Sequence, residues 1–139
     1  MSTVEPYACE VQVRWSDQDI NGHVNNARLV TLVEEVRVRA LKAWGLPAPG
    51  PHRPRVLRSF EVSFDRAVHY GPELTGRAWI SRIGVTSFTV GHELLQQGHR
   101  CVRLHAVMVL LDPDTHRPLA LEPSYRAILE RYLIPRESD

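Results

Sequence analysis

The chain has 139 residues, of which 43% are hydrophobic and 24% are charged, and its formal net charge is +1. This length fits one domain with a hydrophobic core that needs no disulfide staples. The near-zero net charge argues against a nucleic-acid-binding protein or a protein that binds an anionic membrane surface.

The sequence also argues against a membrane-spanning or secreted protein. Its longest unbroken apolar run, Ala106 to Leu111, is far shorter than the ~20 residues that a membrane helix needs, and no signal-peptide pattern opens the chain. The two cysteines, Cys9 and Cys101, form no metal-binding, redox or disulfide motif. We therefore expect reduced thiols in a cytoplasmic protein.

The first half of the chain predicts a strand, a helix and an extended connector. Alternating apolar residues predict a strand from Glu10 to Trp15. Residues 26–44 predict a helix that begins after the N-cap Asn25 and ends near Gly45. Its apolar positions recur every three or four residues, at Leu29, Val33, Val36, Ala40 and Trp44. Four prolines then mark residues 47–54 as an extended connector.

After the connector the apolar pattern changes to a period of two, which is typical of strands. Phe60, Val62 and Phe64 alternate with polar residues and predict a half-buried strand. Residues 77–85, 87–95 and 101–111 predict three more strands, with a turn at 97–99. The last of these strands is apolar on both faces near its end, which indicates an interior strand. A short amphipathic helix is predicted over 124–133, and the whole order predicts an α+β fold with an antiparallel sheet packed on the first helix.

The segment from Arg14 to Arg28 concentrates polar residues just before the predicted helix. Asp17, Asp19 and Asn21 have the spacing that opens an EF-hand calcium loop. The twelfth position of such a loop must supply a bidentate glutamate, but here it is Arg28, and the preceding element has the pattern of a strand. Calcium binding is therefore disfavoured.

A catalytic interpretation fits the same residues better. A helix N-terminus presents unpaired N–H groups and a partial positive charge, which suit the oxyanion of an acyl-transfer reaction. A nearby carboxylate can attack an acyl carbon or activate water, while Asn21 and His23 can orient it or bind the substrate carbonyl. The alternative is that these residues only form turns and cap the helix.

The run Asp17-Gln-Asp-Ile-Asn-Gly-His-Val-Asn-Asn26 resembles the active-site segment of hotdog-fold acyl thioesterases. The resemblance is to the 4-hydroxybenzoyl-CoA thioesterase-like family and, most sharply, to plant-type acyl-carrier-protein (ACP) thioesterases. It implies a single hotdog domain over residues 1–139, with a five-stranded antiparallel sheet wrapped around one long helix. It also implies that Asp19 is a nucleophile or general base, aided by Asn21 and His23, and that the backbone N–H of Asn26 polarises the thioester carbonyl.

The resemblance has one departure and several secondary implications. The carrier-protein branch has Glu-Cys after the helix, where this chain has Ala67 and Val68, which favours a mechanism centred on Asp19. Candidate substrate-binding residues are His69, Ser87 and one of two helix glutamates, Glu34 or Glu35. Arginine side chains on the strands are candidates for contacts to coenzyme A phosphates. The spacing of the histidines predicts no metal site, and no cofactor is implied.

The function predicted from these observations is hydrolysis of an acyl-CoA or acyl-ACP thioester. Two alternatives remain at this level: a hotdog enoyl-thioester hydratase or dehydratase, and a non-catalytic acyl-CoA-binding module. The resemblance further implies a homodimer or homotetramer whose sheet continues across two subunits.

Overall fold

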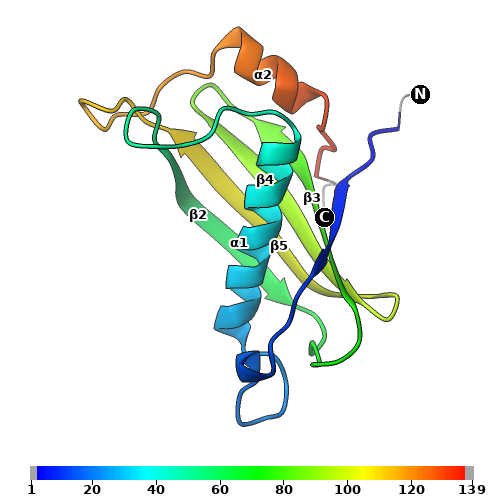
Figure 1. The fold of residues 1–139 in the computed structure, drawn as a ribbon. Coiled ribbons are helices and arrows are strands. Elements are labelled where there is room, and N and C mark those ends of the chain that lie inside the picture. Colours follow the sequence, from blue (N-terminus) through cyan, green and yellow to red (C-terminus); the bar gives the residue numbers. More distant parts are fainter. Residues whose placement is uncertain (1–2, 137–139) are drawn as a thin grey trace.

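The computed structural model describes residues 3–136, which form one antiparallel sheet and a helix that crosses one of its faces (Figure 1). The strand order in the sheet is β1-β3-β4-β5-β2. This arrangement agrees with the α+β fold predicted from the apolar pattern and with the hotdog domain that the resemblance implies. In chain order the elements are β1 (Tyr7–Val11), the one-turn 3-10 helix η1 (Trp15–Asp17), α1 (Asn26–Ala43), β2 (Arg55–Phe64), β3 (Leu74–Ile83), β4 (Ser87–Gln96), β5 (His99–Leu110) and α2 (Pro123–Glu130).

The predicted apolar stripe of α1 forms the core against the sheet. Leu29, Val33, Val36 and Ala40 are all buried, and the helix packs mainly on β1, β3 and β4. A Cβ atom on Gly76 of β3 would lie only 2.3 Å from a methyl carbon of Val36. A glycine at this position therefore lets the helix and the sheet approach closely.

The β4–β5 hairpin is the centre of the sheet, and β5 is an interior strand as predicted. Its turn consists of Gln97 and Gly98, whose φ angles are 51° and 78°. Two residues with positive φ match the right-handed twist of the strands they join. Gly98 adopts this conformation without a steric cost.

The first strand differs from the prediction because it spans Tyr7–Val11 rather than residues 10–15. Val11 pairs with Leu74, the first residue of β3, so the partner strand is exhausted at this point. The carboxylate of Asp17 then accepts a hydrogen bond from the backbone N–H of Arg14 and bends the chain into η1. Trp15, which the alternating pattern places on the apolar face of the strand, is 73% exposed.

The C-terminal part also differs, because α2 ends at Glu130 and the following residues pair with the sheet. The N–H of Ile80 donates to the carbonyl of Tyr132 at 2.9 Å, and the N–H of Ile134 donates to the carbonyl of Ile80 at 2.7 Å. The ring of Tyr132 stacks on Trp44 with centroids 4.6 Å apart. At the β1 edge of the sheet, Arg39 of α1 donates to the carbonyl of Glu10 in β1 at 2.9 Å.

The opposite edge of the sheet is the open edge of β2. Phe60, Val62 and Phe64 alternate as predicted and pair with Ala106, Leu104 and Val102 of β5. Because α1 does not cover this side, Phe60 and Phe64 remain 43% and 40% exposed, and Val56 and Leu57 are also exposed. Among residues 3–136, no helix is both long and apolar enough to cross a membrane.

Candidate active site

The segment between η1 and α1 folds into a tight hairpin that carries Asp19. Gln18 and Val24 form its antiparallel bridge, and the N–H of Asp19 donates to the carbonyl of His23 at 2.8 Å. The carboxylate Oδ1 of Asp19 accepts from the N–H of Asn21 at 2.9 Å. Gly22 closes the turn with a φ of +77°, a conformation that favours glycine. The hairpin therefore fixes the direction of the Asp19 side chain from its own backbone.

A pocket of about 320 Å³ lies beside this hairpin. Asp19, Asn21, His23 and Asn26, the four residues predicted to be catalytic, all line it. The pocket is completed by Leu29 of α1, Phe64 at the end of β2 and residues 65–68 of the loop that follows β2, together with Val24. The sequence-predicted group thus converges on one concave surface.

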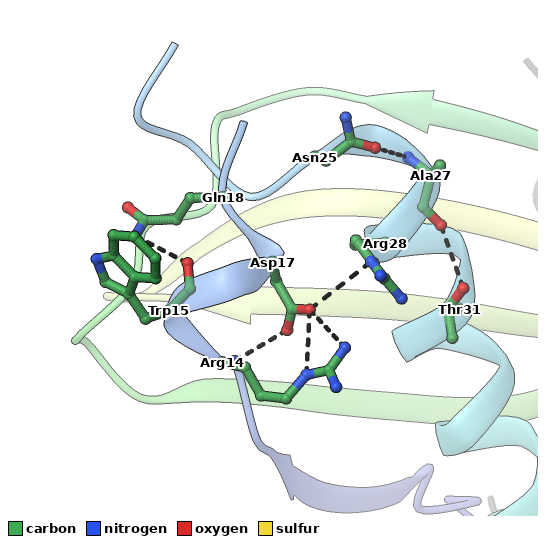
Figure 2. Close-up of polar contacts among 8 residues, drawn as sticks. All are labelled: Arg14, Trp15, Asp17, Gln18, Asn25, Ala27, Arg28 and Thr31. Carbon is green, nitrogen blue, oxygen red and sulfur yellow. Dashed lines mark hydrogen bonds and ion pairs between the residues drawn. The ribbon is translucent and has the colours of Figure 1, made fainter. Parts of the chain in front are cut away.

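The N-terminus of α1 borders the same pocket. The side chain of Asn25 caps the helix by accepting from the N–H of Ala27 at 2.8 Å (Figure 2). The carbonyl of Asn25 accepts from the N–H of Leu29. Among the hydrogen bonds of residues 3–136, none uses the N–H of Asn26. That N–H group and the positive end of the helix dipole are available to a ligand oxygen in the pocket.

Asp17 is the last residue of η1, just before the hairpin, and its carboxylate lies between two arginines (Figure 2). Its Oδ1 lies 3.0 Å from Nη2 of Arg14 and 3.8 Å from Nε of Arg28, and its Oδ2 accepts from the N–H of Arg14. The carbonyl of Asp17 accepts from the N–H of Asn25, so this residue connects η1 to the start of α1. These contacts make Asp17 part of the scaffold that holds the hairpin.

The ionisation of Asp17 follows from the same contacts. Burial alone would raise the pKa of the Asp17 carboxyl, but the hydrogen bonds from Arg14 and the positive charges of Arg14 and Arg28 outweigh it. The net effect holds the pKa of Asp17 below its ordinary value. The carboxylate is therefore ionised at neutral pH and already neutralised by its partners.

The loop after β2 forms the second wall of the pocket. The N–H of Val24 donates to the carbonyl of Val68 at 2.9 Å, which ties this loop to the hairpin. Ala67 and Val68 line the pocket, so the positions aligned with the Glu-Cys pair of the carrier-protein branch do lie at the site but carry no such groups. The sequence alone did not identify Phe64 and Asp65 as pocket residues. Their positions just before Ala67, which the resemblance aligns with an active-site position, could have indicated them.

His69 does not line the pocket, but it contacts the pocket residue His23. The two imidazole rings meet edge to face, with centroids 5.0 Å apart and an interplanar angle of 88°. Asp65 is held by Ser63, whose hydroxyl donates to it at 2.7 Å, and by Arg100 at 3.4 Å. The hydrogen bond from Ser63 is the main reason that the pKa of Asp65 lies below its ordinary value.

Within residues 3–136, the other residues predicted to bind substrate do not line this pocket either. Ser87 begins β4, whereas the site lies near the far end of that strand, roughly 30 Å away. Glu34 lies on α1 with its carboxylate 3.6 Å from Arg37. Glu35 lines a separate pocket of about 270 Å³ together with Arg14, Asp17 and Arg28.

The buried histidines are sheet residues, as expected from their positions in strands. Nδ1 of His92 lies 2.9 Å from the carbonyl of Leu104, and Nδ1 of His105 lies 3.3 Å from the hydroxyl of Ser81. Within residues 3–136, no three His, Cys, Asp or Glu side chains are grouped to hold a metal ion. Both cysteines are free thiols.

Comparison with known proteins agrees with this geometry. The sequence profile of the thioesterase-like superfamily matches residues 13–129. A predicted thioesterase from Bacillus stearothermophilus is 26% identical, with a TM-score of 0.87, and the match covers 96% of this chain and 100% of that chain. A thioesterase from Thermus thermophilus, solved with coenzyme A and Zn, is 25% identical, with a TM-score of 0.79 and coverage of 94% of this chain and 95% of that one.

A more distant structure shows the same fold. It is a 1,4-dihydroxy-2-naphthoyl-CoA thioesterase from Synechocystis, which is 17% identical, with a TM-score of 0.80 and coverage of 90% of this chain and 96% of that one. No curated protein matches the sequence significantly. Since the superfamily profile spans most of the chain, the protein belongs to the thioesterase-like superfamily and is a thioester hydrolase with a hotdog fold.

Proposed function

We propose that the protein hydrolyses acyl-CoA thioesters and that Asp19 is its catalytic carboxylate. The observation that carries this proposal is the convergence of Asp19, Asn21, His23 and Asn26 on one pocket at the N-terminus of α1. Asp19 suits this role because its Oδ1 is oriented by the N–H of Asn21, and no guanidinium neutralises it within residues 3–136. The pocket thus combines an anionic group with a helix end of opposite polarity.

The reaction follows from these two features. Acting as a general base, Asp19 takes a proton from water while the water oxygen bonds to the thioester carbon. Acting as a nucleophile, it bonds to that carbon itself and forms an anhydride that water then hydrolyses. In both routes the C–S bond breaks, the thiolate leaves and takes up a proton, and the acyl group ends as a free acid.

The N-terminus of α1 stabilises the charge that develops on the carbonyl oxygen. The N–H of Asn26 donates to this oxygen, and the positive end of the helix dipole adds a favourable field. Asn21 and His23 line the same pocket and can hydrogen-bond the substrate beside Asp19. This scheme requires no metal or cofactor.

Two features favour coenzyme A over a carrier protein as the thiol carrier. Arg66 lines the pocket, and its guanidinium suits the phosphates of coenzyme A. One of the similar structures, the Thermus thermophilus thioesterase, is described as a complex with coenzyme A.

The test is an assay of thiol release from a panel of aliphatic and aromatic acyl-CoAs. Asp19→Asn keeps the size and the acceptor oxygen of the side chain but removes its charge, so turnover should fall by about a hundredfold or more while the fold persists. Asp114→Asn, an exposed carboxylate in the loop after β5, is the matched control and should leave the rate unchanged.

Three results would contradict the proposal. The first is that no acyl-CoA in the panel releases thiol, and the second is that Asp19→Asn has an unchanged rate. The third is that an acyl-CoA and the same acyl group on pantetheine have equal KM values. The last comparison addresses coenzyme A separately, because pantetheine lacks the nucleotide phosphates that Arg66 is proposed to contact. Consumption of an enoyl-CoA without thiol release would instead indicate a hydratase.

We also propose that the protein acts as a homodimer joined along β2. This edge strand is ten residues long, has no partner on its outer side within residues 3–136, and exposes Val56, Leu57, Phe60 and Phe64. An open apolar edge is a template for another strand. In a two-fold antiparallel pair, the first residues of the second copy's β2 would run past Phe64, which lines the pocket of the first copy.

A further inference from the structure

We propose that Gln96 is a positioning residue of the active site, which holds His69 against His23 through the backbone of the loop after β2. This inference rests on the function proposed above and extends it to a residue that does not line the pocket. Gln96 is the last residue of β4, is 4% exposed, and points its side chain at the loop that joins β2 to β3.

The amide of Gln96 makes three hydrogen bonds to this loop. Its Oε1 accepts from the N–H of His69 at 2.9 Å. Its Nε2 donates to the carbonyl of His69 at 2.9 Å and to the carbonyl of Pro72 at 3.0 Å. Both donors of the amide and one lone pair of its oxygen are thus used on two residues of one loop. The side chain pairs with both backbone groups of His69, as a residue on a neighbouring strand would.

The loop carries two contacts to the Asp19 hairpin at adjacent positions. The carbonyl of Val68 accepts from the N–H of Val24, and the imidazole of His69 meets the imidazole of His23 edge to face. His69 is itself exposed, so neighbouring side chains do not enclose it. The place of His69 beside His23 is therefore set by its backbone, because Gln96 forms hydrogen bonds with both its N–H and its carbonyl.

The consequence for catalysis is indirect. His23 lines the pocket with Asp19, and its ring has His69 on one side. If the loop shifts, His23 loses this contact and samples other rotamers, and a misplacement of about 1 Å at a reacting group lowers turnover by up to a hundredfold. Gln96 touches no group that the reaction uses, so its effect should pass through His69.

Gln96→Leu tests this, because leucine has a similar size and no hydrogen-bonding group. We expect kcat to fall by roughly tenfold or more, with a smaller change in KM. Val90→Ala, a buried truncation on the same strand, is the control for lost stability and should leave kcat within about twofold at a temperature where it is folded. Gln96→Asn, which is one methylene too short, should behave like Gln96→Leu.

A double-mutant cycle then separates positioning from general destabilisation. In a His69→Ala background, Gln96→Leu should change kcat no further, although its cost in thermal stability persists. Multiplicative losses in kcat would overturn the proposal, because Gln96 would then act by a route that does not include His69. Unchanged kcat in Gln96→Leu would overturn it as well.

A second readout does not depend on activity. In the NMR spectrum of the wild-type protein, ring protons of His23 and His69 should show a mutual NOE, because their rings lie in contact. Gln96→Leu should abolish this NOE, and Val90→Ala should retain it. If the NOE behaves this way but Asp19→Asn is fully active, the positional role stands and the proposed function fails. If the NOE survives in Gln96→Leu, the positional role fails whatever the assay shows.

Discussion

Two carboxylates, Asp17 at the end of η1 and Asp19 in the active-site hairpin, lie two residues apart, and their surroundings give them different properties. Asp17 is buried, and Arg14 and Arg28 neutralise its charge, so it can neither approach a substrate nor accept a proton readily. Asp19 is partly exposed and lines the pocket. The environment, rather than the residue type, separates a scaffold carboxylate from a proposed catalytic one.

His92 is the buried group whose titration should be most visible in stability. Its imidazole is fully buried between the sheet and α1, and its Nε2 has no hydrogen-bond partner within the described residues. Burial lowers the pKa of His92 to about 3; the hydrogen bond to Leu104 opposes this, and the charges of Arg37 and His105 add to it. The folded protein therefore keeps this side chain neutral.

The sign of the pH effect follows directly. Below its ordinary pKa of about 6.5, the unfolded chain binds a proton at His92 that the folded chain does not bind. The free energy of unfolding should therefore fall as the pH drops, by about 2 kcal/mol at pH 5. Urea unfolding at pH 7 and pH 5 measures it. His92→Leu should lose most of this difference, whereas His52→Leu, at an exposed position, should keep it. An equal loss in both variants would contradict the assignment.

At the scale of elements, the start of α1 serves both stability and chemistry. Asn25 caps the helix, while the next residue, Asn26, presents the N–H group proposed to bind the oxyanion. A negative charge at the cap stabilises a helix N-terminus, but it also competes with the oxyanion for the same positive end. The two roles therefore make opposite demands on residue 25.

Asn25→Asp exposes this conflict. The variant keeps the acceptor for the Ala27 N–H, so its melting temperature should equal or exceed that of the wild type. Its kcat should nevertheless fall on the order of tenfold, which corresponds to roughly 1.4 kcal/mol in the activation free energy. Asn25→Ser, a neutral cap, should retain kcat. Equal kcat in the two variants would argue against the helix N-terminus as the oxyanion site.

The elements themselves follow from local patterns, whereas their ends follow from partners. The stripe from Leu29 to Ala40 predicts α1 because a helix buries one face by its own period. Strand β1 ends at Val11 because β3 begins opposite it, which no local pattern contains. The position of Ser87 at the other end of β4 has a related reason: residue type suggests chemistry but does not say which end of a strand meets the pocket.

The site shows the same division. Asp19, Asn21 and His23 belong to one contiguous segment, so the sequence could group them, and the turn at Gly22 brings them to one pocket. Gln96 lies 27 residues after His69, and nothing in its neighbours marks it. Such a contact depends on where the connection from β2 to β3 crosses the end of β4, and it becomes visible only in three dimensions.

At the scale of the whole molecule, the proposed dimer depends on the exposed apolar residues of β2. Phe60→Lys places a charge in the middle of this strand and should convert a dimer to a monomer in sedimentation experiments at micromolar concentration. Val85→Lys changes a residue that is 72% exposed but lies outside β2, and it should leave the assembly intact. A wild-type protein that sediments as a monomer, or a dimer that survives Phe60→Lys, would contradict the arrangement.

The two edges of the sheet differ in how much unpaired backbone they offer, and this difference limits how far other copies of the chain can extend the sheet. On the β1 side, the strand has only five residues, Arg39 occupies the Glu10 carbonyl, and the chain after α2 occupies the β3 edge at Ile80. Among residues 3–136, only the β2 side of the sheet offers a long run of open backbone. A sheet that can be extended from one side alone joins like edge to like edge and then stops. In the proposed dimer, the two long β2 edges pair with each other and leave only the short β1 edges outside, which disfavours further growth into fibres.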